Sequence, residues 1–159
     1  NNIYNKEGKA IYIVPLKALA TEKYKSFQKK YPDTKIALSI GDKDASDSKL
    51  ADYDCIITVS EKLDSLLRHN VQWLKDIKTV IVDEIHLLHD PHRGPTLEIV
   101  ITILRSLLKN IQVIGLSATI GNPKELASWL DANLVEDSWR PVKLHHGTHH
   151  EGKITFYDK

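Results

Sequence analysis

Short apolar runs rich in β-branched residues alternate with longer amphipathic stretches along most of the chain. The first pair is AIYIV at residues 10–14, followed by the helical pattern KALATEKYKSFQKKY at residues 17–31. Further strand-like runs are KIALSI (35–40), CIITV (55–59), TVIV (79–82) and IQVIGL (111–116). Further helical patterns begin at Ser60, near Pro95 and at Asn122. Strands that alternate with helices form parallel sheets covered on both faces, so this order predicts an α/β domain with a mostly parallel sheet.

The composition limits the class of protein. The 159 residues suffice for one hydrophobic core, and shares of 42% hydrophobic and 27% charged residues are those of a soluble globular protein. The sequence has no apolar run of about 18 residues, the length that indicates a membrane span. Cys55 is the single cysteine, which excludes an intrachain disulfide. We expect a cytoplasmic protein with no membrane partner.

The last residues follow a different pattern. VKLHHGTHHEGKITFYDK, residues 142–159, has two short strand-like pieces around a turn that contains glycine and histidine, which predicts a hairpin. We therefore expect one compact domain over residues 1–140 and a linker with a hairpin over residues 141–159.

Charge is unevenly distributed although the formal net charge is only +1. Residues 1–35 hold eight lysines and three acids, whereas residues 41–54 hold two lysines and five acids. Such asymmetry permits a polyanion on one face of the domain. For any single lysine, a solvated helix face is the alternative interpretation.

Two neighbouring acids follow the apolar run TVIV. Asp83 and Glu84 are therefore expected at the carboxyl edge of the sheet, where ligands of open α/β sheets bind. An aspartate placed there can hold phosphate-bound Mg²⁺ through water, and the next acid can orient or deprotonate an attacking water. His86 could sense the nucleotide. The alternative is that strands often end in acids because their ends meet solvent, and a two-residue motif does not exclude this.

A second polar group follows the strand-like run IQVIGL. Ser117, Ala118 and Thr119 form the sequence SAT, whose hydroxyl groups could hydrogen-bond to the acidic site at a neighbouring strand end. DEIH and SAT in this order resemble motifs II and III of superfamily-two helicases of the DEAD/H-box type. Motif Ia is matched by VPLKALATEKYKSF, a following Gly-Asp motif by SIGD, and motif Ib by TVSEKLDSLLR.

The extended motif is similar to that of one branch of these helicases. DEIHLLHDPHRGPTLE resembles the pattern of the Ski-like branch, and WLDANLVEDSWRPVKL resembles that branch's exit toward its second motor domain. Within the branch, the chain is most similar to archaeal DNA helicases of replication-fork repair, which are related to the helicase part of DNA polymerase theta. The likeness covers nearly the whole chain.

This resemblance implies the RecA-like P-loop NTPase fold and the first motor domain of an ATP-dependent helicase, which translocates on single-stranded or forked DNA, with RNA left open. Asp83 would hold Mg²⁺ through water, Glu84 would activate water, and His86 would report the state of the bound ATP. The residues implied in coupling to the remaining helicase domains are Ser117, Ala118 and Thr119. Those implied in contacts to the nucleic-acid backbone are Pro15, Lys17, Ala18, Gly41, Asp42, Ser60, Glu61 and Lys62.

One helicase element is missing from these 159 residues. The phosphate-binding loop, Gly-x-x-x-x-Gly-Lys followed by Ser or Thr, does not occur, and the Gly-Lys pairs at Gly8 and Gly152 are followed by Ala10 and Ile154. We expect a first motor domain that is incomplete at its N-terminus, with weak or no ATP binding and no hydrolysis by this chain alone. The alternative is a non-catalytic domain that binds nucleic acid or a partner, or half of a split helicase.

Four other groups of residues require an interpretation. Two histidine groups, His86 with His89 and His92 and the tail group His145, His146, His149 and His150, could ligate zinc, although Pro91 makes one continuous helix through His92 unfavourable. The tryptophans are interpreted as packing residues: Trp73, Trp129 and Trp139. Residues Arg93, Gly94 and Glu98 belong to the Ski-like pattern, but Gly94 and Pro95 also suit a helix start, so we assign them no chemistry.

Overall fold

The computed structural model describes residues 8–41, 47–69, 71–118, 120–137, 139 and 141–157. It divides the chain into two compact units, residues 1–123 and 124–159, and each is described by itself. Asp42 and Thr119 lie outside the described residues.

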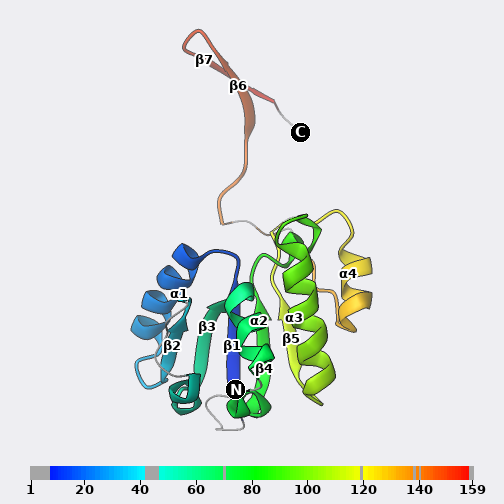
Figure 1. Ribbon diagram of the computed structural model, residues 1–159. Helices are drawn as coiled ribbons and strands as arrows, with labels where there is room; N and C mark the ends of the chain where they lie inside the picture. The colour runs from blue at the N-terminus through cyan, green and yellow to red at the C-terminus, as the bar shows by residue number, and fades with distance from the viewer. Residues whose placement is uncertain are drawn as a thin grey trace. The chain divides into compact units, whose positions relative to one another are not determined.

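The first unit is built on a five-stranded parallel sheet in the order β2-β3-β1-β4-β5 (Figure 1). The strands are β1 (Lys9–Val14), β2 (Ile36–Ser39), β3 (Cys55–Val59), β4 (Ile77–Val82) and β5 (Gln112–Gly115). All four pairings are parallel. The predicted α/β fold with a parallel sheet is therefore confirmed.

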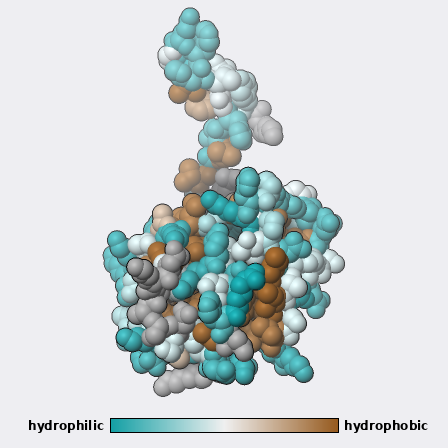
Figure 2. All heavy atoms as spheres, in the orientation of Figure 1, coloured by the Kyte–Doolittle hydropathy of each residue, from teal (hydrophilic) through white to brown (hydrophobic). Residues whose placement is uncertain are grey.

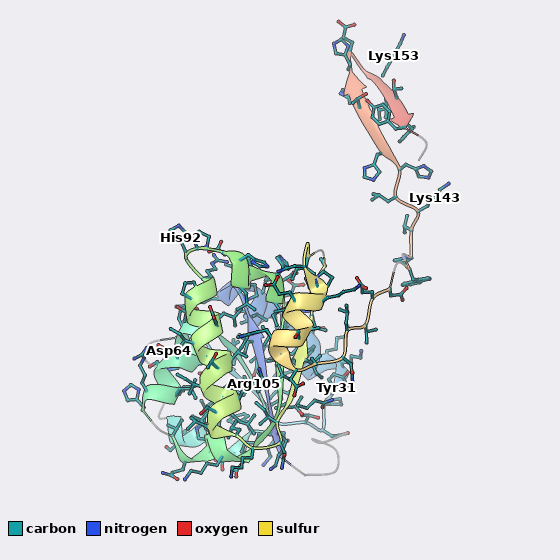
Figure 3. All side chains as sticks on the ribbon, turned by 90° about the vertical axis from the view of Figure 1, so that its right-hand side faces the viewer. Tyr31, Asp64, His92, Arg105, Lys143 and Lys153 are labelled. Carbon is teal, nitrogen blue, oxygen red and sulfur yellow. The ribbon has the colours of Figure 1, made fainter. Side chains whose placement is uncertain are left out.

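Helices cover both faces of this sheet. They are α1 (Lys17–Lys30), α2 (Ser60–Arg68) and α3 (Gly94–Leu107), with short 3₁₀ turns η1 (Asp47–Asp52), η2 (Gln72–Asp76) and η3 (Ile85–His89). α1 leads from β1 toward the β2 side, whereas α2 and α3 lead toward the β5 side. Right-handed crossovers in opposite directions place helices on opposite faces. Accordingly, Tyr31 at the end of α1 and Asp64 of α2 lie on opposite sides of the sheet (Figure 3).

The strand register brings the carboxyl ends of the strands to one edge. Val14 pairs with Val59, Ile13 with Val82, and Val82 with Gly115. The residues that follow β1, β3, β4 and β5 therefore leave the sheet at nearly the same level. The switch in crossover direction between β1 and β4 is also where open α/β sheets form ligand crevices.

Burial explains why the strands read as continuous apolar runs. All five residues of β3 and the last five of β1 are buried, because a sheet covered on both faces hides both sets of alternating side chains. β4 begins at Ile77, two residues before the predicted run, because Ile77 is itself buried and pairs with Lys9. Trp73 is buried, as predicted, whereas Trp139 is 73% exposed, so the packing interpretation is wrong for Trp139.

The second unit contains most of α4 (Pro123–Leu130), a helix that begins at Pro123, and the hairpin of β6 (His146–His150) and β7 (Lys153–Tyr157). The strands are antiparallel, and His150 pairs with Lys153. The two turn residues, Glu151 and Gly152, have φ values of 49° and 77°, as a tight hairpin turn requires. The predicted C-terminal hairpin is confirmed. Within the part of the chain that the structure describes, no helix has the length and apolar character needed to cross a membrane.

Candidate functional site

Asp83 lies directly beyond β4, and its carboxylate is held by groups from three elements. Its backbone N–H donates to the carbonyl of Ile13 at 2.9 Å. Its Oδ2 accepts a hydrogen bond from the Tyr12 hydroxyl at 3.0 Å and lies 3.2 Å from Nζ of Lys23. Its Oδ1 accepts the N–H of Glu84 at 3.2 Å. With 17% of the side chain exposed, Asp83 is a fixed and largely enclosed carboxylate.

The environment of Asp83 changes the acidity of its two neighbours. The pKa of Tyr12 is raised, mainly by burial and then by its hydrogen bond to Asp83. For Lys23, burial alone would lower the pKa, but the hydrogen bonds to Asp83 and Tyr12 outweigh it and raise the pKa. Both shifts keep the protons on the tyrosine and the lysine, so the pair donates to Asp83 at neutral pH.

Glu84 has an unusual backbone conformation. Its φ of 53° and ψ of 45° lie in the left-handed region, which is uncommon for residues other than glycine. This conformation turns the chain from β4 into η3, where the N–H of Leu87 donates to the Glu84 carbonyl at 2.9 Å. Such a strained conformation persists only where the surrounding structure holds the residue in place. Strained residues of this kind cluster at functional sites. The Glu84 side chain is 40% exposed at the edge of the sheet.

His86 links the acidic turn to the end of β5. Its Nδ1 lies 3.3 Å from Oε2 of Glu84 and 3.4 Å from Oγ of Ser117. The tautomer decides the direction of these contacts: a protonated Nδ1 donates to the Glu84 carboxylate, whereas a bare Nδ1 accepts from the Ser117 hydroxyl. Of the other predicted coupling residues, Ala118 is exposed.

Backbone contacts hold these two strand ends together. The N–H of Leu116 donates to the Val82 carbonyl, and the N–H of Ile85 donates to the Leu116 carbonyl, both at 2.9 Å. At Gly115, an added Cβ would lie 2.9 Å from Cδ1 of Ile85. The absence of a side chain at Gly115 lets the turn after β4 approach the end of β5.

The residues predicted to contact nucleic acid leave the same edge. Pro15 follows β1, and Lys17 and Ala18 are the first residues of α1, all accessible or partly accessible. Ser60, Glu61 and Lys62 open α2, and Gly41 lies two residues beyond β2. The N-cap residues, Leu16 and Val59, are aliphatic and offer no side-chain cap. The first N–H groups of an α-helix have no intrahelical acceptor, so they suit an anion.

A pocket joins the acidic turn to these helix starts. Its lining residues are Ile13, Val14, Pro15, Ser60, Asp83, Glu84, Leu87, Arg93 and Leu97.

Sequence reasoning missed Tyr12, Lys23 and Arg93 as members of the site. The tyrosine interrupting an otherwise aliphatic strand was the one signal available for Tyr12. Nothing local distinguishes Lys23 from the other lysines of α1.

The chemistry of the acidic turn fits Mg²⁺. This ion prefers oxygen ligands and usually binds through one or two carboxylates, water and substrate phosphates, and not in a cage made entirely of protein groups. Asp83 and Glu84 supply the carboxylates. Among the described residues, no group of three or more His, Cys, Asp or Glu side chains is placed to hold a metal, so the zinc alternative gains no support there. His89 instead contacts Oδ1 of Asn122 at 3.0 Å.

Comparison with known proteins identifies the family. Residues 1–126 match the DEAD/DEAH box helicase family. The chain belongs to this family. Relatives named ATP-dependent DNA helicase Hel308 are 53% identical over 156 residues in Methanococcus vannielii, 55% over 157 residues in Methanocaldococcus jannaschii and 49% over 159 residues in Pyrococcus horikoshii. The helicase resemblance predicted from the motifs is therefore confirmed.

These alignments cover the two proteins unequally. They include 96%, 98% and 99% of this chain but 20%, 13% and 22% of the three relatives. The chain thus spans about a fifth or less of the length of these DEAD/DEAH box helicases, and it corresponds to one segment of each.

Proposed function

We propose that this chain is part of the first motor domain of an ATP-dependent DNA helicase that works in the cytoplasm. Residues 1–140 would form the RecA-like domain, and residues 141–159 would lead to the second motor domain. The main support is the convergence of Asp83, Glu84, His86 and Ser117 at the sheet edge from which α1 and α2 also begin. A nucleotide site and a nucleic-acid-binding surface at one edge are what a motor needs.

In this proposal each acidic residue has a separate task. Asp83, held by Tyr12, would orient the water shell of Mg²⁺, and Mg²⁺ would offset the negative charge of the ATP phosphates. Glu84 would accept a proton from the attacking water. His86, in contact with both Glu84 and Ser117, would pass the change at Glu84 to the end of β5.

The contacts to the strand would be made mainly to its backbone. Lys17 and the opening N–H groups of α1 and α2 suit phosphates and carry no base preference. This suits translocation along any sequence. Single-stranded or forked DNA is proposed because the relatives are named as DNA helicases.

The test uses the full-length protein that contains this chain. Glu84→Gln should reduce single-stranded-DNA-stimulated ATP hydrolysis by about a hundredfold or more, because it removes the proton acceptor and leaves the shape intact. Glu98→Gln, an equivalent change at an exposed residue of α3, should keep full activity. Lys17→Gln should raise the DNA concentration needed for half-stimulation, whereas Lys109→Gln, before β5 at the opposite edge, should not. Wild-type hydrolysis by Glu84→Gln would contradict the proposal.

A second candidate function is a non-catalytic domain that binds nucleic acid or a partner, or half of a split helicase. It is supported by the lack of a phosphate-binding loop in these 159 residues and by exposed apolar side chains on α3 and β5. Ile99 and Leu107 of α3 are 48% and 62% exposed, and Figure 2 shows an apolar strip over this helix. Ile114 and Leu116 at β5 are 36% and 41% exposed. In this second candidate, these surfaces suit a partner chain, such as the other half of a split helicase.

A further inference from the structure

Asp83 Oδ2 is contacted by one neutral and one charged donor. The Tyr12 hydroxyl comes from β1. The Lys23 ammonium comes from α1, the helix that packs against Tyr12 on one face of the sheet. Both reach the same oxygen, whereas Oδ1 accepts the single N–H of Glu84. A carboxylate oxygen has room for two acceptor interactions, so Oδ1 keeps the capacity to bind a water or a cation.

Aromatic packing fixes the tyrosine. Its ring meets Phe27 edge-on, with centroids 5.3 Å apart and planes at 89°, and Phe27 in turn meets Tyr31 at 6.0 Å. Lys23 Nζ lies 5.6 Å from the centroid of the Tyr12 ring. The tyrosine is part of the core, with 7% exposed, so its hydroxyl presents a nearly fixed donor to Asp83.

The lysine is held differently. Its side chain is 37% exposed, and its flexible stem lets the ammonium move between Asp83 and solvent. When it contacts Asp83, the Lys23 ammonium offsets the negative charge of the carboxylate, as a metal ion would. A second cation arriving at Asp83 would meet the charge of Lys23 at short range.

We propose that Tyr12 and Lys23 are positioning residues that tune the affinity of Asp83 for its divalent cation in opposite directions. Tyr12 orients the carboxylate for the cation, and Lys23 competes with the cation for it. This inference rests on the proposed role of Asp83 and adds a control of metal affinity to it.

The opposite signs make the inference testable in the full-length protein. The probe is Mn²⁺, titrated with ADP present and followed by electron paramagnetic resonance of free Mn²⁺, which does not depend on turnover. Lys23→Met should tighten binding about three- to tenfold, since it removes a unit charge near a divalent ion. Tyr12→Phe should weaken binding about tenfold, as loss of a hydrogen bond that orients a metal ligand does. Lys23→Arg should stay near the wild-type value.

Matched controls lie on α1. Lys25→Met removes an exposed lysine, and Tyr24→Phe removes a hydroxyl that accepts from Gln28 instead. Neither should shift Mn²⁺ affinity. A merely structural role would lower thermal stability in both test variants without moving Mn²⁺ affinity, and that result, or shifts of the same sign, would overturn the inference. If Lys23→Met does not fold, Lys23→Gln replaces it with the same expected direction.

One further variant separates this inference from the proposed function. Asp83→Asn should abolish the tight Mn²⁺ binding. If it does so while Lys23→Met and Tyr12→Phe match their controls, the tuning role fails and the metal site stands. If Asp83→Asn leaves binding unchanged, the metal role of Asp83 and the tuning role fail together.

Discussion

Gly94 begins α3 in close contact with the backbone of η3. A Cβ on this residue would overlap the carbonyl oxygen of Leu88, and the next atoms it would meet, Leu88 C at 2.9 Å and Leu87 O at 3.3 Å, also belong to the backbone. Backbone atoms cannot rotate aside as a side chain can. The glycine therefore allows α3 to start directly after Arg93, which lines the pocket beside Glu84.

We predict that Gly94→Ala lowers the free energy of unfolding by about 1–3 kcal/mol, because it overpacks a site that cannot relax. Gly121→Ala is the matched control, since an added Cβ there meets nothing within 4 Å, and it should change stability by less than about 0.5 kcal/mol. Urea unfolding of both variants measures the difference. Equal stabilities would show that η3 shifts freely and that this contact does not restrain it.

Individual site residues were predictable to different degrees. Asp83, Glu84, His86 and Ser117 could be placed at strand ends because each follows an apolar run. Tyr12 could not be assigned to the site, since its bond to Asp83 spans 71 residues of sequence and depends on β1 pairing with β4. The left-handed conformation of Glu84 also has no sequence signal, because glutamate rarely adopts it.

Among the elements, β3 has the most enclosed environment. It lies between β2 and β1, and all five of its residues are buried. Cys55 at its start has its pKa raised from 9.0 to about 12, chiefly by burial and then by the charge of Asp54. A thiol with such a pKa stays protonated and unreactive while the sheet is intact.

The raised pKa predicts a loss of stability in alkali. Between about pH 9 and 12 the unfolded chain has lost the thiol proton and the folded chain has kept it, so unfolding releases a proton. The Cys55 contribution to the free energy of unfolding should therefore fall by about 1.4 kcal/mol per pH unit in this window and stay constant below it. Urea unfolding of wild type and Cys55→Ala at pH 8 and pH 10 isolates this contribution. If the difference in the free energy of unfolding between wild type and Cys55→Ala is the same at pH 8 and pH 10, the prediction is wrong.

Elements were predicted well because strand and helix patterns differ in period. The five strands, α1 and α2 lie within one or two residues of the predicted runs. The 3₁₀ turns η1, η2 and η3 were not predicted, because five or six residues make two 3₁₀ turns or fewer, too few for that period to be recognised. Since η3 carries His86, part of the site geometry lay beyond sequence patterns.

For the molecule as a whole, the balance of charges at the strand edge decides what this chain can bind alone. Asp83 and Glu84 repel phosphates, and Lys23 is already paired with Asp83. ATP binding by helicases of this type needs a loop of backbone N–H groups and a lysine around the phosphates, and these 159 residues contain no such sequence. The helix starts of α1 and α2 are one other source of phosphate contacts at this edge.

We therefore predict that isothermal titration of this chain with magnesium ATP gives no binding heat at concentrations up to about 1 mM, since the acids at the edge lack a phosphate-binding loop to offset them. A segment that carries the phosphate-binding loop of a relative, added in trans, should produce both binding and ATP hydrolysis if the chain is half of a split helicase. Glu84→Gln is the control, because it should keep the restored binding and lose the hydrolysis. Tight binding by the chain alone would mean that the starts of α1 and α2 hold the phosphates, which would move the nucleotide to the surface assigned above to the DNA strand.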